Sequence, residues 1–286
     1  MKRKSVIVAM IILGMALILI FDNTHSILLS PLTSPEAFLA SMPYWNISFF
    51  GLEFVFIQPS SSFFVYLLGG LMIAIGVVFL KNGKKHPSRL YFAIALILWG
   101  IGTLLAGSSY QAFGFELKCR DLDYCVFTSK FELLYLLVTA ISIEFMVVST
   151  AYVSLKPENR QKLIRYAFFH GIGYFLFLFI GIILPVQFLI SYEGFMVFMG
   201  GNFVLMFILN ILHYKKHKDR LNLQFIRLWL LFLLVNVGYF IYLFSGLSEI
   251  LYANPGIWFN ANDVLHLLLI GWAIGIYRLL NKELSV

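Results

Sequence analysis

The stretch SSFFVYLLGGLMIAIGVVFLKNGKKHPSRLYFAIALILWGIGTLLAG, residues 61–107, decides the fold because it holds two long apolar runs joined by a short basic segment. The runs cover residues 61–80 and 90–107. An α-helix rises about 1.5 Å per residue, so about 20 apolar residues cross a hydrocarbon core of roughly 30 Å. Lipid offers no partners to peptide N–H and C=O groups, so each run is expected to be a transmembrane helix.

The same pattern continues along the whole chain. Six further apolar runs cover residues 5–21, 131–154, 163–190, 194–213, 223–245 and 263–280. Hydrophobic residues make up 60% of the 286 residues and charged residues only 12%, which is too few charges to cover the surface of a soluble domain. The sequence therefore predicts an all-α fold: a polytopic transmembrane bundle of eight helices that forms a single integral membrane domain over residues 1–286.

The distribution of basic residues predicts the orientation. If the N-terminus is cytosolic, 18 of the 21 Lys and Arg residues fall in cytosolic segments, and only Lys118, Arg120 and Lys130 lie outside. Cytosolic segments of membrane proteins carry such an excess, so both termini are expected in the cytosol, with the bundle in the plasma (inner) membrane. The basic residues would contact anionic lipid headgroups. They are not interleaved with aromatic residues, so no nucleic-acid partner is expected.

The first run, residues 5–21, follows MKRKS, which is also how a secretory signal begins. Residues 20–25, IFDNTH, offer no pair of small residues for cleavage. The run is therefore expected to be a retained anchor. If it were cleaved, seven helices would remain and the mature N-terminus would lie outside.

The longest connection, residues 22–60, is expected outside the membrane as a lid-like loop. Ser34, Pro35 and Glu36 predict a helix start with a capping hydroxyl, and Pro43 stops that helix. The following WNISFFGLEFVFI predicts either a small hairpin or an interfacial segment. We expect the whole segment to pack over the outer end of the bundle. The alternative is a folded-down loop with no gating role.

The second outer loop, residues 108–130, contains both cysteines of the chain, Cys119 and Cys125. The outer face of a plasma membrane is oxidising, so a disulfide between them is expected. Its simplest role is to staple the loop.

Polar residues gather near the outer ends of three predicted helices. They are Ser108, Tyr110, Gln111, Glu116, Glu132, Asn262, Asp263 and His266. Polar groups at membrane depth are costly and are therefore candidates for function. Asp263 and His266 are three residues apart, and Asn262 and His266 are four apart, so these three share one helical face. The predicted topology puts the whole set in one leaflet.

Two kinds of chemistry fit this set. His266, Asp263 and Glu132 could ligate a divalent metal such as zinc, with a water at the open position. Alternatively, His266 could act as a general base held by Asp263, with Ser108 or Ser109 as the nucleophile. A structural explanation competes with both. Helix N-termini favour caps and negative charge, which accounts for Asn262, Asp263 and Glu132, and His266 would then be a core histidine.

Glu144 lies near the middle of the run 131–154, where a carboxylate must pair, be protonated or face a cavity. Its helical neighbours are apolar. Candidate partners on other helices are His170, Asn202 and Asn236. The structural alternative is a protonated Glu144 that is hydrogen-bonded in the core.

The stretches SSYQAFGFELKC, YCVFTSKFELLYL and NDVLHLLLIGW, together with PLTSPEAFLASMP, resemble an uncharacterised group of prokaryotic multi-pass membrane proteins. This resemblance covers the whole chain and implies the topology but no activity. By topology alone, the chain also resembles the intramembrane hydrolase superfamily of alkaline ceramidases and adiponectin-type receptors. That resemblance implies a zinc ion held partly by H-x-x-x-H in the last helix. Here the residue four after His266 is Ile270, so the motif is absent.

The leading hypothesis is a binding, sensory or accessory membrane protein whose ligand is a lipid or small molecule; whether it is an enzyme stays open. One alternative is an intramembrane lipid hydrolase at the outer leaflet, and it predicts that the outer polar set converges on one pocket. Another is a proton-coupled transporter that uses Glu144 with Asn202 and Asn236. It predicts a polar track from the outer set through Glu144.

Overall fold

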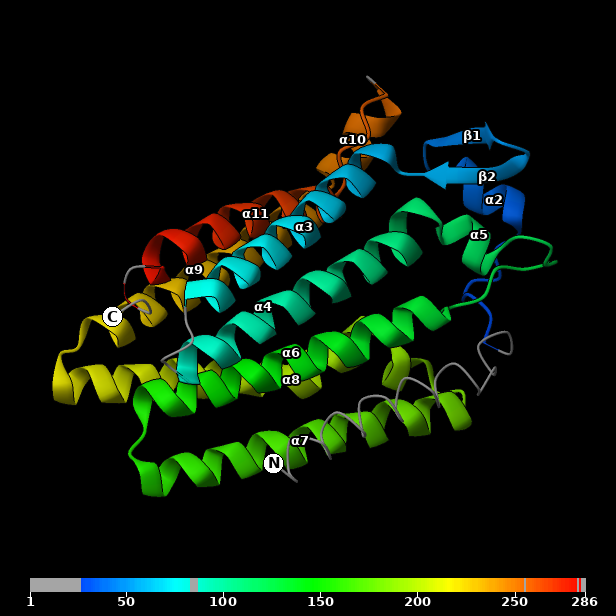
Figure 1. Ribbon diagram of the computed structural model, residues 1–286. Coiled ribbons are helices and arrows are strands. Elements are labelled where there is room, and N and C mark those ends of the chain that lie inside the picture. The colour runs from blue at the N-terminus through cyan, green and yellow to red at the C-terminus, as the bar shows by residue number, and fades with distance from the viewer. Residues whose placement is uncertain (1–26, 83–86, 255, 282, 284–286) are drawn as a thin grey trace.

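The computed structural model describes residues 27–82, 87–254, 256–281 and 283 (Figure 1). Within these residues, seven helices are long and apolar enough to cross a membrane. They are α3 (Pro59–Asn82), α4 (Pro87–Ala106), α6 (Lys130–Ser154), α7 (Pro157–Ile183), α8 (Tyr192–His217), α9 (Arg220–Phe244) and α11 (Ala261–Leu280). The predicted all-α polytopic bundle is confirmed for these seven runs. The eighth predicted helix, residues 5–21, lies outside the described residues.

Six of the long helices form a closed ring. α3 packs on α4, α4 on α6, α6 on α8, α8 on α9, α9 on α11, and α11 returns to α3. α7 stands outside this ring and packs mainly on α6, at one edge of the bundle (Figure 1). The ring matters for function because it can enclose a space between the helices.

One end of the bundle, which we call the hairpin end, carries most of the short elements. They are α2 (Pro35–Ala40), β1 (Tyr44–Phe49), β2 (Leu52–Ile57), the π-helix η2 (Gly107–Ala112), α5 (Gly114–Lys118), the 3-10 helix η3 (Gln187–Ile190) and α10 (Leu247–Ala253). Ser34 caps α2 as predicted, since its hydroxyl accepts a hydrogen bond from Ala37 N at 3.2 Å. β1 and β2 pair as an antiparallel hairpin, with Gly51 at φ +79° in the turn. The predicted disulfide Cys119–Cys125 is present.

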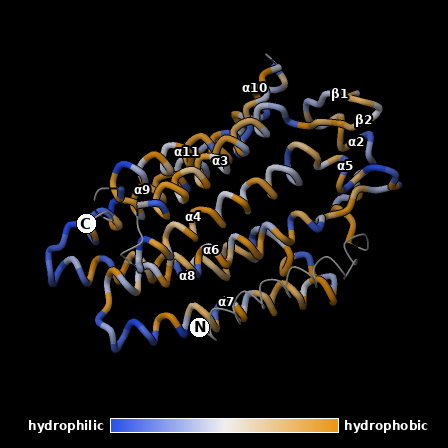
Figure 2. Tube along the Cα trace, in the orientation of Figure 1, coloured by the Kyte–Doolittle hydropathy of each residue, from blue (hydrophilic) through white to orange (hydrophobic). Residues whose placement is uncertain are grey.

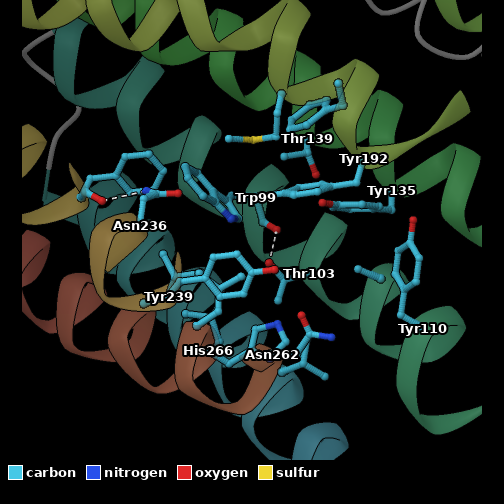
Figure 3. Close-up of a pocket in the computed structure, with 18 of the residues that line it drawn as sticks. Trp99, Thr103, Tyr110, Tyr135, Thr139, Tyr192, Asn236, Tyr239, Asn262 and His266 are labelled. Atoms are coloured by element: carbon cyan, nitrogen blue, oxygen red, sulfur yellow. Dashed lines mark hydrogen bonds between the residues drawn. The ribbon is translucent and has the colours of Figure 1, made fainter. Parts of the chain in front are cut away.

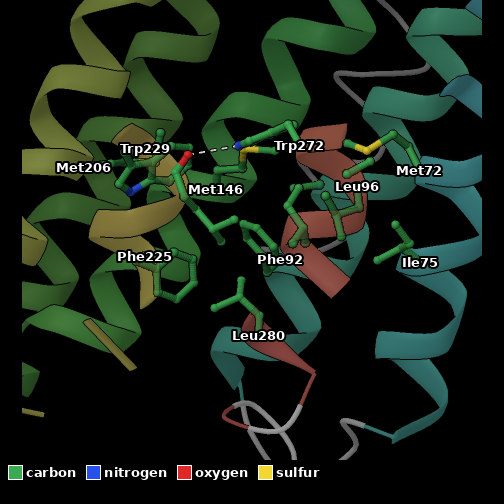
Figure 4. Packing of buried hydrophobic residues seen from close by; sticks show 14 of the residues in the cluster. Met72, Ile75, Phe92, Leu96, Met146, Met206, Phe225, Trp229, Trp272 and Leu280 are labelled. Carbon is green, nitrogen blue, oxygen red and sulfur yellow. Dashed lines mark hydrogen bonds between the residues drawn. The ribbon is translucent and has the colours of Figure 1, made fainter. Parts of the chain in front are cut away.

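The surface of the long helices is apolar along their middle and hydrophilic toward their ends (Figure 2). Large apolar side chains such as Val197, Leu234 and Ile241 are more than half exposed. Water would penalise so much exposed apolar surface, whereas lipid does not. The inner face packs around Phe92, Trp272 and their neighbours (Figure 4).

Hydrogen bonds between helices supplement the packing. The Ser142 hydroxyl of α6 donates to the Ala95 carbonyl of α4 at 2.7 Å, and Ser149 donates to Ser88 O at 2.9 Å. Arg89 is fully buried and reaches Phe79 O of α3 at 3.0 Å and Asn281 O, just past α11, at 3.3 Å. Small and polar residues fasten membrane helices in this way, because lipid cannot compete for their hydrogen bonds.

A polar network ties α6, α8 and α9 together away from the hairpin end. Asn210 donates to the Ser154 hydroxyl and to Asn222 Oδ1, both at 2.9 Å, and Ser154 also donates to Asn222 Oδ1 at 2.7 Å. Trp229 Nε1 donates to Asn210 Oδ1 at 2.9 Å. No buried polar atom of these four side chains lacks a partner within the described residues. The network is thus a satisfied structural fastening.

Gly100→Ala tests the close contact of α3 with α4. A Cβ on Gly100 would lie 2.6 Å from the Gly69 carbonyl oxygen, whereas a Cβ on Gly70 would meet no atom of another helix within 4 Å. We expect Gly100→Ala to lower the free energy of unfolding by about 1–3 kcal/mol, because it overpacks the interface. Gly70→Ala is the matched control and should preserve stability or raise it. Thermal unfolding in detergent measures both, and equal melting temperatures would contradict the packing.

Candidate ligand-binding cavity

A partly open cavity of about 250 Å³ lies between the helices of the ring, toward the hairpin end (Figure 3). Side chains from α3, α4, η2, α6, α8, α9 and α11 line it. They are Val65, Leu68, Trp99, Thr103, Ala106, Tyr110, Gln111, Tyr135, Thr139, Ile143, Tyr192, Phe195, Met196, Phe203, Phe232, Asn236, Tyr239, Asn262, Leu265, His266 and Leu269. Every helix of the ring therefore contributes to one site.

Aromatic rings form much of the cavity wall. Trp99 packs edge-on against Phe232 with ring centroids 6.0 Å apart, and Tyr110 packs edge-on against Tyr135 at 6.1 Å. No Asp, Glu, Lys or Arg of the described chain lines the cavity. The walls therefore suit an uncharged molecule with an apolar or aromatic body.

Three buried polar atoms in the lining have no hydrogen-bond partner within the described residues. They are Gln111 Oε1, Thr139 Oγ1 and His266 Nδ1. They come from η2, α6 and α11, so they are far apart in sequence yet share one cavity. Buried polar atoms in native proteins are nearly always hydrogen-bonded, so each exception needs an explanation. A bound molecule in the cavity is an explanation that covers all three.

A π-helix places Tyr110 and Gln111 at the cavity. Within η2 the chain turns more widely than an α-helix, and Phe113 N donates to Ser108 O, five residues back, at 2.9 Å. The wider turn changes the angular spacing of the side chains at the end of α4. π-helical turns of this kind occur frequently at functional sites.

The sequence-predicted outer set divides between the cavity and other partners. Four members of the set line the cavity, and a common site requires such a shared pocket. They are Tyr110, Gln111, Asn262 and His266. Asn236, proposed as a partner of Glu144, also lines it, and its Nδ2 donates to Phe232 O at 2.8 Å. The remaining members of the outer set have partners elsewhere.

The metal site predicted from His266, Asp263 and Glu132 is not formed. No group of three or more His, Cys, Asp or Glu side chains within the described ranges is arranged to hold a metal ion. Glu132 is buried in an ion pair, with its Oε1 accepting from Lys118 Nζ at 2.8 Å and from Ser109 Oγ at 3.0 Å. Glu132 is therefore paired with Lys118, and no contact joins it to His266 or Asp263 within the described residues.

Asp263 is a helix-capping residue and does not hold His266. Its carboxylate accepts from Asn260 N at 2.9 Å, and Asn260 Oδ1 accepts from Asp263 N at 3.0 Å, which is a capping box. The N-cap is thus Asn260, two residues before the predicted Asn262.

The proposed nucleophile, Ser108, is likewise engaged away from His266. Its hydroxyl donates to Leu104 O at 2.9 Å and lies 3.0 Å from the Tyr66 hydroxyl. The arrangement of Ser108, His266 and Asp263 needed for nucleophilic catalysis is therefore not formed. Glu116 has a structural role, because its Oε1 accepts from Val55 N of β2 at 2.6 Å and its Oε2 pairs with Arg120.

Glu144 lies outside the cavity, in a separate cluster. Its Oε1 lies 2.6 Å from His170 Nδ1 and accepts from Asn202 Nδ2 at 2.9 Å. Two of the three partners predicted for Glu144 are therefore present, and Asn236 is not among them. The Glu144 cluster is therefore separate from the polar residues that line the cavity.

Sequence reasoning missed much of the cavity wall because its residues are aromatic side chains and threonines, which are common in membrane helices. Trp99, Thr103, Thr139, Tyr192 and Tyr239 all belong to this class. A signal was present in the spacing. Trp99 and Thr103, Tyr135 and Thr139, and Asn262 and His266 are each four residues apart on their helices, so each pair shares a face.

Comparison with known proteins gives no match: no protein-family model, curated protein or solved structure is significantly similar to this chain. The function must therefore be argued from the site itself.

The ion pair of Lys118 with Glu132 can be tested by a double-mutant cycle. Both side chains are nearly fully buried, so Glu132→Gln leaves an unpaired buried charge. We expect Glu132→Gln or Lys118→Met alone to lower the free energy of unfolding by about 3–5 kcal/mol, and the double variant to cost less than the sum. Denaturation in detergent gives the three values. Additive effects would show that the pair contributes no coupling.

Proposed function

We propose that this protein is a multi-pass membrane receptor or binding protein, whose cavity holds one small, uncharged, amphipathic molecule. The observation that carries the proposal is that three unpartnered buried polar atoms, Gln111 Oε1, Thr139 Oγ1 and His266 Nδ1, belong to residues that line one aromatic cavity. A ligand that bonds to these atoms would remove a cost of about 1–3 kcal/mol for each of them.

The ligand class follows from the chemistry of the lining. Gln111 Oε1 only accepts hydrogen bonds, so the ligand carries a donor opposite it. The Thr139 hydroxyl and His266 Nδ1 can donate or accept, which leaves room for a carbonyl or hydroxyl opposite them. Pockets for drug-sized molecules measure about 300–1,000 Å³, so a cavity of about 250 Å³ suits a single ring system with one or two polar groups. Aromatic walls favour a planar ring.

The hydrogen bonds of the candidate catalytic residues favour a binding function over hydrolysis. Ser108 and Asp263 have hydrogen-bond partners away from His266, so nothing activates a nucleophile beside the imidazole. His266 is better used as a polar contact for a ligand. A small molecule held by a ring of helices also suits a sensory or accessory role, because its binding can change the packing of every helix that lines the cavity.

We place the protein in the plasma membrane, with the hairpin end outside and both termini in the cytosol. The bias of 18 of 21 Lys and Arg toward one side supports this orientation. The disulfide at the hairpin end supports it too, since disulfides persist in oxidising compartments. In this orientation the cavity lies in the outer half of the membrane.

Retention of a native ligand tests the proposal without knowledge of its identity. Protein purified from its own membranes would be extracted and analysed by mass spectrometry beside Ala106→Phe, which fills the cavity. Ile101→Phe on the same helix is the control, because Ile101 does not line the cavity and is 39% exposed. We expect one small molecule retained by the wild type and by Ile101→Phe and lost from Ala106→Phe. Identical extracts from all three would contradict the proposal.

Thr139→Val tests the cost of the unpartnered hydroxyl. Valine has nearly the same shape and removes an unsatisfied polar atom, so ligand-free protein should become more stable by about 1–3 kcal/mol, with weaker ligand retention. Thr150→Val is the control on the same helix, because the Thr150 hydroxyl donates to Met146 O at 3.0 Å. That variant should be neutral or destabilised. If the melting temperatures of both variants fell equally, this would contradict the expectation that the Thr139 hydroxyl is unpartnered in the ligand-free protein.

A further inference from the structure

A second polar cluster lies between α6, α7 and α8, deep in the membrane-spanning part of the bundle. Glu144 of α6 comes 14 residues after Lys130 and 10 before Ser154. At about 1.5 Å per residue it is roughly 15 Å from the nearer end of its helix. Its Oε1 lies 2.6 Å from His170 Nδ1 of α7 and accepts a hydrogen bond from Asn202 Nδ2 of α8 at 2.9 Å.

The geometry of the cluster is held by further contacts. The Tyr166 hydroxyl donates to Asn202 Oδ1 at 2.9 Å, so the amide is oriented with its Nδ2 toward Glu144. Asn202 is completely buried. The His170 ring lies between Tyr166 and Phe198, with ring centroids 5.2 and 4.8 Å away. The imidazole is thus positioned on the carboxylate by packing as well as by its hydrogen bond.

One atom of the cluster is left open. Glu144 Oε2 is buried and has no hydrogen-bond partner within the described residues. The network of Ser154, Asn210, Asn222 and Trp229, which joins α6, α8 and α9, leaves no such atom. A polar cluster whose only role is to fasten helices is expected to be satisfied in the same way. The open oxygen therefore indicates that Glu144 has an additional partner, and a carboxylate within the membrane is a functional candidate by default.

The carboxylate and the imidazole are close enough to share a proton, at 2.6 Å between Glu144 Oε1 and His170 Nδ1. The titratable groups that face the Glu144 carboxyl are His170 and Tyr166, both on α7. α8 contributes the neutral amide of Asn202, and no titratable side chain of α4, α8 or α9 interacts with the carboxyl within the described residues. Adding one proton to a neutral imidazole and a carboxylate takes the pair from one net negative charge to neutrality. A low-dielectric surrounding strongly favours the neutral form over the charged one.

We propose that Glu144, His170 and Asn202 form a proton-binding site inside the membrane, which takes up and releases one proton. The proton resides on the Glu144 carboxyl or between it and His170 Nδ1. Asn202 stabilises the deprotonated state through its hydrogen bond to Oε1.

The site adjoins the ligand cavity on two helices. Ile143 and Phe203 line the cavity, and they are the sequence neighbours of Glu144 and Asn202. A shift of α6 or α8 on protonation would therefore be felt at the cavity wall. The proton site itself does not depend on whether the cavity binds a ligand.

Infrared difference spectroscopy of the purified full-length protein between low and high pH tests the proposal. A buried protonated carboxyl gives a C=O stretch that is distinct from the stretches of solvent-exposed carboxyls. We expect such a band to appear as the pH falls, to be absent in Glu144→Gln and to remain in Glu158→Gln. Glu158 lies in the first turn of α7 and is exposed, so it is the matched control.

A Glu144 band that stays constant at every pH would overturn the proposal, since it would show a permanently protonated structural residue. If the spectrum of Glu144→Gln kept every band of the wild type, the proposal would be overturned as well. His170→Gln is the second variant, and it keeps the proposal testable if Glu144→Gln does not fold. Removal of the imidazole should displace the pH at which the band appears, whereas an unchanged midpoint would contradict the shared proton.

Discussion

The absence of hydrogen-bond partners in hydrocarbon is the constraint on which the rest of this structure depends. It makes each apolar run a helix, and it requires that polar side chains inside the bundle find partners within the protein. Most of them do, as Arg89 does with Phe79 and Asn281, and as Lys118 does with Glu132. Within the described residues, eight buried side-chain atoms do not, and four of these fall at two places: the cavity of the helix ring and the Glu144 cluster.

These two places lie on different faces of α6. Along α6, Tyr135, Thr139 and Ile143 face the cavity, whereas Glu144 faces α7 and α8. α6 is also the most deeply buried of the long helices. A helix in this central position connects the ring to α7, and a change at either site bears on the packing of the other.

The helices could be predicted from sequence because hydropathy is a property of each segment by itself. The ring could not, because it depends on which apolar faces meet, and seven apolar helices offer similar faces. The site was predicted in part for the same reason. Asn262 and His266 share a helical face and do line the cavity, but Glu132 is engaged by Lys118, which only the fold brings into place. Asp263 is engaged locally, in the capping box with Asn260. Thr139 gave no sign of its role, since a threonine in an apolar helix commonly bonds to its own backbone.

A high-resolution structure of the full chain, purified from its own membranes, tests the central claim most directly. The account predicts non-protein density in the cavity within hydrogen-bond distance of Gln111 Oε1, Thr139 Oγ1 and His266 Nδ1. A structure in which these atoms bond only to protein groups or to ordered water, with no molecule between the aromatic walls, would contradict it.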